Sequence, residues 1–180
     1  MKIIGVCCSC LPKSISQKAV KEFLRGAQEN GHETELLQIS KNLNGCTGCH
    51  ACKKAETFCV QRDVLQHYFE VLPEADVVVL GAGIYMGYPQ GEAWNFMNRH
   101  FCLHRAVMQE GESNCRIAPG KKLYAFFSQG APDNPEYRKN YEALLKPFDG
   151  WGFVREEPFV LSGGNSEEKI REAYELGKQL

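Results

Sequence analysis

The chain has 180 residues, of which 43% are hydrophobic and 24% are charged, and its formal net charge is −1. This length is that of one domain, and the composition is ordinary for a soluble globular protein. The near-neutral charge gives no indication of a nucleic-acid-binding surface. The apolar start MKIIGVCC is too short for a signal-peptide core, and no window of eighteen apolar residues predicts a membrane span. We therefore expect a single domain over residues 1–180, in the cytoplasm, with no nucleic-acid or membrane partner.

The first third of the chain predicts a strand, a helix and a second strand. Residues 2–8 form a short apolar run typical of a buried strand, and the apolar spacing within residues 16–30 predicts a helix that ends at Gly31. Residues 33–39 predict the second strand. The stretch 41–62 shows no clear period and contains a cysteine-rich loop.

The rest of the chain repeats this alternation. Asp63 is placed to cap a helix that Pro73 stops. The further strands are predicted at residues 76–82, 121–128 and 154–162. The further helices are predicted from about Gly91 to His104, from Pro135 onward, and after Asn165, which with Glu168 resembles a capping box.

Five strands that alternate with helices imply a parallel sheet covered on both faces. In such sheets, ligands bind outside the carboxyl ends of the strands, at the topological switch point. This rule selects the three loops at 9–16, 83–90 and 128–135 as the candidate ligand site.

The first of these loops suits a phosphate. It leads from a strand into a helix, and a helix N-terminus presents unpaired N–H groups and a partial positive charge. Ser9, Ser14 and Ser16 add hydroxyl donors, and Lys13 adds charge. The alternative is that Ser14 or Ser16 only caps the helix.

Two segments resemble the NAD(P)H-dependent FMN reductase group of the flavodoxin-like superfamily. Residues 8–19, CSCLPKSISQKA, resemble its first loop, and residues 81–99, GAGIYMGYPQGEAWNFMNR, resemble its second loop. The second match is the more specific. It keeps the motif positions in register at Gly81, Tyr85, Gly87, Gly91, Phe96 and Arg99. The resemblance implies an α/β flavodoxin-like three-layer sandwich, with a five-stranded parallel sheet in the order 2-1-3-4-5.

The resemblance also implies the residues that bind FMN. Ser9, Lys13, Ser14, Ile15 and Ser16 would surround the phosphate. The isoalloxazine ring would lie beside Gly83, Ile84, Tyr85, Met86 and Gly87, and the third flavin loop would be Ser128, Gln129 and Gly130. Tyr85 would stack on or near the flavin, or else be a buried residue at a strand end.

The sequence departs from the family pattern at several positions. Cys8, Cys10 and Leu11 replace the usual glycine, proline and arginine of the first loop, and Gly83 replaces a proline of the second. The missing arginine removes one phosphate charge, and a cysteine in place of a glycine could crowd the loop. Cys7, Cys8 and Cys10 are expected to be small buried residues, with a reactive dithiol near the helix as the alternative.

The chain has nine cysteines, and four of them form a compact motif. Cys46, Cys49, Cys52 and Cys59, within a loop at about 45–60, read C-x2-C-x2-C-x6-C. Two-residue spacers let successive thiolates turn toward one point, as a cubane cluster requires. The spacing resembles the iron–sulfur flavoproteins, a branch of the same superfamily with a [4Fe–4S] motif in this loop. Zinc is less natural, because zinc ligands usually come as two separated pairs. Free or structural thiols, as in related cluster-free loops, remain the second alternative.

These features predict an FMN-dependent NAD(P)H oxidoreductase or electron-transfer flavoprotein, with a [4Fe–4S] cluster as a further hypothesis. Its partners would be a small-molecule or protein electron donor and acceptor, and the resemblance implies a homodimer or homotetramer. A pure electron carrier of flavodoxin type is disfavoured, because such carriers are strongly acidic. The alternative function is a cysteine-rich binding module with a degenerate flavin site or a structural metal.

Overall fold

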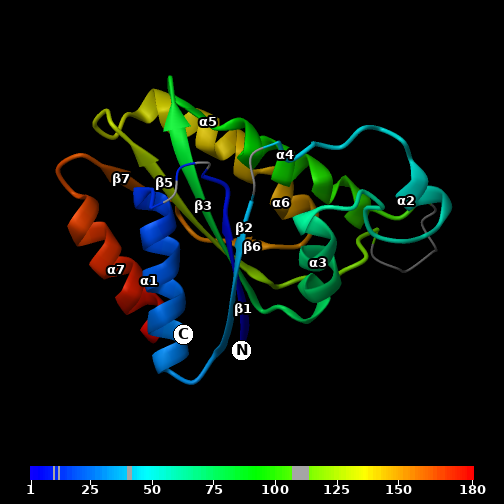
Figure 1. Ribbon diagram of the computed structural model, residues 1–180, viewed down its shortest axis with the longest axis horizontal. Coiled ribbons are helices and arrows are strands. Elements are labelled where there is room, and N and C mark those ends of the chain that lie inside the picture. Colours follow the sequence, from blue (N-terminus) through cyan, green and yellow to red (C-terminus); the bar gives the residue numbers. More distant parts are fainter. Residues whose placement is uncertain (10, 12, 40–41, 107–113) are drawn as a thin grey trace.

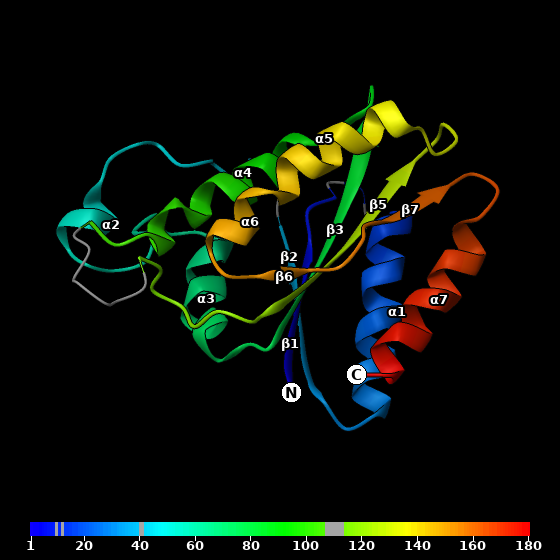
Figure 2. The same cartoon turned by 180° about the vertical axis from the view of Figure 1, so that it is seen from behind.

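The protein is a parallel sheet between two layers of helices, as Figures 1 and 2 show. The computed structural model describes residues 1–9, 11, 13–39, 42–106 and 114–180. The sheet has the neighbour order β2-β1-β3-β5-β6, with β7 also beside β5 and all these pairs parallel. These strands are β2 (Glu33–Gln38), β1 (Lys2–Cys7), β3 (Val77–Tyr85), β5 (Lys122–Gln129), β6 (Val154–Arg155) and β7 (Phe159–Ser162). The predicted fold and strand order are confirmed.

Two details of the sheet differ from the prediction. The expected fifth strand at 154–162 is split into β6 and β7. Glu156 N still donates to Leu123 O at 2.9 Å, but Pro158 has no N–H to donate, and the ladder resumes only at Phe159. A short strand, β4 (Tyr88–Pro89), pairs antiparallel with the end of β3. This pair lies beyond the parallel ladder and does not alter the order of the central strands.

The helices cover both faces of the sheet. One face packs on α1 (Ile15–Glu29) and α7 (Ser166–Lys178), and the opposite face on α3, α4, α5 and α6. The second set is α3 (Val64–Val71), α4 (Gly91–Arg99), α5 (Pro135–Leu145) and α6 (Pro147–Gly150), with the 3₁₀ turns η1 (Leu72–Glu74) and η2 (His100–Leu103). The stretch without a period contains one short helix, α2 (Ala51–Lys54). In the described part of the chain, no helix is long and apolar enough to cross a membrane.

The helix ends predicted at Gly31 and Asp63 form as expected, whereas the one at Asn165 does not. Gly31, at φ +83°, and His32 donate back to Gln28 O and Ala27 O, which closes α1 as predicted. Asp63 caps α3 by accepting from Leu65 N at 3.0 Å. The expected capping box at Asn165 is wrong. Its side chain turns back to β7, where Oδ1 accepts from Ser162 N at 2.9 Å, and so it makes no cap contact with α7.

Helices α1 and α7 pack at very short range through two glycines. A Cβ at Gly26 would lie 2.1 Å from Tyr174 O, and a Cβ at Gly177 would lie 2.0 Å from Phe23 O. Since real Cβ atoms do not approach backbone this closely, any side chain at either position must push the helices apart.

We expect Gly177→Ala to lower the free energy of unfolding by about 1–3 kcal/mol, because overpacking outweighs the better helix propensity of alanine. Gly91→Ala is the matched control, since Gly91 is also helical and nothing lies near its Cβ position. Urea unfolding of both variants provides the measurement. A Gly177→Ala protein at least as stable as the wild type would contradict the close packing.

Candidate functional site

The three loops selected from the sequence line one cleft of about 350 Å³ at the carboxyl ends of β1, β3 and β5. The predicted residues that line it are Ser9, Lys13, Ser14, Ile15, Gly83, Ile84, Tyr85, Ser128, Gln129 and Gly130. Leu11 and Gly163 complete the lining. Three predicted residues do not line the cleft, namely Ser16, Met86 and Gly87. Cys10 lies outside the described residues.

The first loop ends at the N-terminus of α1. Ser14 is the cap residue, and its hydroxyl accepts from Gln17 N at 3.2 Å. Ser14 therefore does cap the helix. The first-turn N–H groups of Ile15 and Ser16 still have no carbonyl partner inside the helix. Ser16 is fully buried, with its Oγ 3.4 Å from that of Ser14. With Lys13 beside it, this helix end is suited to an anion.

Two amide side chains, of the exposed Gln38 and the buried Gln17, hold the first loop, and sequence reasoning did not identify either. Gln38 Nε2 donates to Cys7 O at 3.0 Å and to Ser9 O at 2.9 Å. Gln38 Oε1 accepts from Gln17 Nε2, and Gln17 Oε1 accepts from Lys13 N at 2.9 Å. The end of β2 is thus tied to the loop that follows β1. The sequence feature that could have indicated this role is that Gln38 ends a strand expected to lie beside β1.

A third glutamine joins the first and second loops. Gln90 Oε1 accepts from Gly83 N at 3.2 Å, and its Nε2 donates to Cys8 O at 2.5 Å. Cys8, which replaces the family glycine, is fully buried in the core and does not line the cleft. The expected crowding by Cys8 is therefore absent from the described structure. Cys7 is also fully buried, and burial raises its pKa to about 12, so Cys7 and Cys8 are core residues as expected.

The second loop is a tight hairpin turn between β3 and β4. Met86 and Gly87 have φ of +52° and +83°, which is the pattern of a type I′ turn. A Cβ at Gly87 would lie 2.8 Å from the ring of Tyr137, so glycine is also required by the packing of the turn on α5. Met86 is 93% exposed, whereas Tyr85 is 55% exposed and lines the cleft. The alternative of a buried strand-end tyrosine is wrong.

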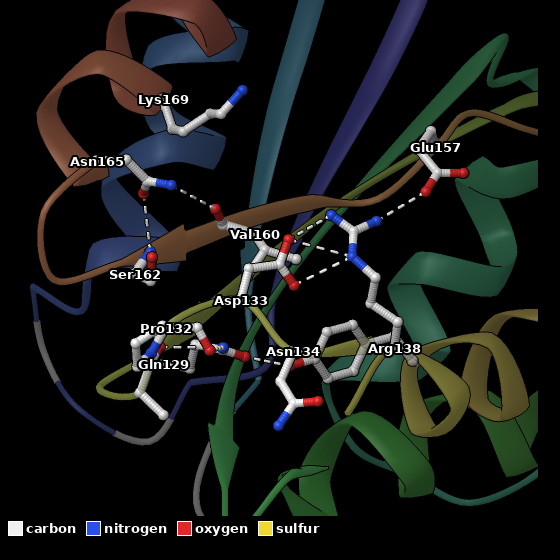
Figure 3. A network of polar contacts seen from close by, with 12 residues as sticks. Gln129, Pro132, Asp133, Asn134, Arg138, Glu157, Val160, Ser162, Asn165 and Lys169 are labelled. Atoms are coloured by element: carbon white, nitrogen blue, oxygen red, sulfur yellow. Dashed lines mark hydrogen bonds and ion pairs between the residues drawn. The ribbon is translucent and has the colours of Figure 1, made fainter. Parts of the chain in front are cut away.

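The third loop, after β5, is held by its own side chains. Gln129 Nε2 donates to Ala131 O and Pro132 O at 3.1 and 2.8 Å, and its Oε1 accepts from Tyr141 OH. Figure 3 shows Arg138 between Asp133 and Glu157, with Nη–O distances of 2.5 and 2.8 Å. These contacts fix the chain on both sides of Gly130 and so shape this wall of the cleft.

The four cysteines of the motif line a second, much smaller pocket. Cys46 and Cys49 are exposed, Cys52 is buried and Cys59 is half-buried. Gly48 and His50 adopt φ of +67° and +56°, which turns the chain between successive cysteines. Figure 1 shows α2, which lies within this loop, at the end of the molecule away from α1 and α7.

Local contacts distinguish the sulfurs. The Ala51 N–H, followed by the Thr47 hydroxyl, lowers the pKa of the Cys49 thiol, whereas burial raises the pKa of Cys52. Arg99 Nε donates to Cys59 Sγ at 3.1 Å. Among the described residues, no three His, Cys, Asp or Glu side chains converge as ligands of a single metal ion. A single zinc ion needs such convergence, whereas the thiolates of a [4Fe–4S] cluster bind different irons and lie further apart.

Comparison with known proteins identifies the family. The model for NADPH-dependent FMN reductase matches residues 1–119. The iron-sulfur flavoprotein of Methanosarcina thermophila is 34% identical over 145 residues, which cover 80% of this chain and 71% of that protein. Iron-sulfur flavoprotein MJ1083 of Methanocaldococcus jannaschii is 34% identical over 100 residues, which cover 55% of this chain and only 51% of that relative.

Solved structures show the same fold. The NAD(P)H:quinone oxidoreductase from Methanothermobacter marburgensis superposes with a TM-score of 0.73 at 14% identity, over 99% of this chain and 98% of that one. The azoreductase from Bacillus anthracis str. Sterne gives 0.71 at 17% identity, over 99% of each chain. The chain therefore belongs to the NADPH-dependent FMN reductase family, in the iron–sulfur flavoprotein branch of the flavodoxin-like superfamily. It is an FMN-dependent oxidoreductase.

Proposed function

We propose that this protein is an NAD(P)H-dependent oxidoreductase that binds FMN in the cleft and a [4Fe–4S] cluster at Cys46, Cys49, Cys52 and Cys59. The observation that carries the proposal is the presence of both sites in one chain. Loops far apart in sequence line one cleft, and the four motif cysteines line one pocket. The relatives named iron-sulfur flavoproteins support the same assignment.

The residues of the cleft fit FMN. The phosphate would bind the α1 N-terminus, between the Ser14 hydroxyl and Lys13, and Ser9 lines the same cleft. The flavin ring would lie along Gly83, Ile84 and Tyr85. Gly83 stands where the family has a proline, and because it has no side chain the backbone can come close to the ring. Bound flavin would accept two electrons as hydride from a reduced nicotinamide nucleotide and release them singly.

The further features of the proposal follow from the same residues. The electron acceptor is a small molecule or a protein. We propose the cytoplasm as the location, because clustered cysteines in a reducing compartment more often bind metal or carry out redox chemistry than form disulfides. The alternative of a degenerate flavin site is weakened by Cys8, whose side chain lies in the core and leaves the cleft open.

The phosphate site predicts a charge-specific loss of FMN. We expect Ser14→Asp to weaken FMN binding at least about tenfold, roughly 1.4 kcal/mol, because its carboxylate would repel the phosphate. Aspartate caps a helix as well as serine does, so α1 should remain intact. Ser14→Asn is the control, since it keeps the cap without the charge. Fluorescence titration with FMN measures both. Equal affinities of the Asp and Asn variants would place the phosphate elsewhere.

The cluster site predicts a selective loss of iron. In protein prepared without oxygen, replacing any one of Cys46, Cys49, Cys52 or Cys59 with serine should sharply lower iron and sulfide content. Flavin content should stay, because the cleft is formed by other loops. Cys115→Ser is the control, since Cys115 does not line the cysteine pocket. Anaerobic wild-type protein that contains zinc or no metal would overturn the cluster, and protein with iron but no flavin would overturn the FMN site.

We also propose that the protein is a homodimer or homotetramer in which one subunit's cysteine loop approaches another's cleft. The exposed hairpin of Tyr85, Met86 and Tyr88 beside the cleft supports an apolar contact there. Sedimentation velocity should show an oligomer at micromolar concentration. A monomer that still oxidises NAD(P)H with bound flavin would exclude a functional need for the assembly.

A further inference from the structure

Arg99 is a buried cation that contacts the last cysteine of the motif. Its side chain has no exposed surface, and it extends from the end of α4 into the pocket that the cysteines line. Nε donates to Cys59 Sγ at 3.1 Å. Hydrogen bonds from charged donors are the strong ones, and burial from water increases their strength.

The same guanidinium joins both ends of the cysteine loop. Nη1 donates to Asn44 O at 3.1 Å, before the first cysteine, and to Asp63 Oδ2 at 2.6 Å, after the last. Nη2 donates to Asp63 Oδ1 at 3.2 Å. The planar guanidinium makes these four contacts from three separate nitrogens, whereas a lysine has three donors on a single nitrogen.

Cys59 is the cysteine that most needs such a contact. The first three cysteines are two residues apart, so local turns place them, but six residues separate Cys52 from Cys59. The position of Cys59 must therefore be fixed by something outside the loop. Arg99, on a different element, supplies that contact.

Other cations near the loop do not contact a sulfur in the described structure. Lys53 Nζ donates to the carbonyls of Phe101 and His104. Arg116 bonds Glu56 at 2.9 Å and the carbonyls of Cys102 and Cys52 at 3.1 and 3.5 Å. Both side chains bind backbone carbonyls. Of these three cations, Arg99 is the one that donates directly to a sulfur.

We propose that Arg99 is a positioning residue that fixes Cys59 as the fourth cluster ligand and raises the reduction potential of the cluster. The inference rests on the proposed cluster. Reduction adds one electron to the cluster, from reduced flavin in the protein or from dithionite in a titration, and no bond forms or breaks. Because the reduced cluster is the more negative form, a nearby cation and a hydrogen bond to sulfur favour it.

The test compares Asp63→Asn with the double variant Arg99→Gln, Asp63→Asn. Asparagine keeps the cap of α3, and the pair of changes avoids leaving a lone carboxylate beside the loop. Iron content and the reduction potential, followed by electron paramagnetic resonance under anaerobic dithionite titration, are measured for both. Flavin content and circular dichroism report whether each protein is folded.

We expect Asp63→Asn to keep its iron and a potential no lower than that of the wild type. The double variant should lose iron, or keep it with an equilibrium constant for reduction about tenfold lower, about 59 mV for a one-electron couple. Arg116→Gln removes a cation that contacts the same loop but no sulfur, and the potential of this variant should stay near that of the wild type. If the double variant does not fold, Arg99→Lys replaces it, with a smaller fall in the same direction expected.

The outcomes separate the inference from the function on which it rests. Anaerobic wild-type protein without a cluster overturns the proposed cluster site and this inference with it. Wild-type protein with a cluster, together with Arg99 variants that keep the same iron and potential, overturns the role of Arg99 alone. A fall of equal size in Arg116→Gln also overturns it, because general charge would then account for the effect.

Discussion

The burial of β3 on both faces is the constraint on which the rest of the structure depends. From Val77 to Ile84 every residue is buried, and the strand is paired with β1 on one edge and β5 on the other. Parallel pairing with both neighbours brings the ends of β1, β3 and β5 to the same edge of the sheet. The cleft lies at this edge, between the loops that follow the three strands. Its position follows from the ladder, before any residue of the loops is considered.

Amide side chains convert this open edge into a shaped cleft. Gln38, Gln90 and Gln129 each use their side chains to hold backbone carbonyls or amides of the loops, and all three come from the ends of strands or from the residue before α4. Gln90 and Gln129 are buried, and an unpaired buried amide costs free energy, so the loops that they contact are restrained to conformations that satisfy them. Rigid loops on a rigid sheet suit a cofactor that must be held while electrons pass through it.

The sequence predicted the parts of the structure that local pattern determines. Apolar runs gave the parallel sheet, Gly31 and Asp63 gave helix ends, and the glycine-rich second loop gave the family. It did not predict the break at Pro158, because a single proline in an apolar run is compatible with an edge strand that continues. It also misplaced the contacts of Asn165, whose amide is used by β7. The roles of Gln90 and Arg99 were missed for a different reason. Each acts on residues that are distant in the sequence, and only the fold brings those residues together.

Helix α4 connects the two sites. Gln90 precedes its first turn and contacts the cleft loops, and Arg99 ends it and contacts Cys59. Nine residues of helix rise by about 13 Å, so α4 holds the cleft and the cysteine pocket apart at a fixed spacing within one chain. The second-loop motif encodes both ends of this spacer, since it begins at the cleft and finishes at Arg99. One continuous segment of sequence thus determines the second loop of the cleft, the helix and the cation at the cysteines, and a change of helix length would move one site relative to the other.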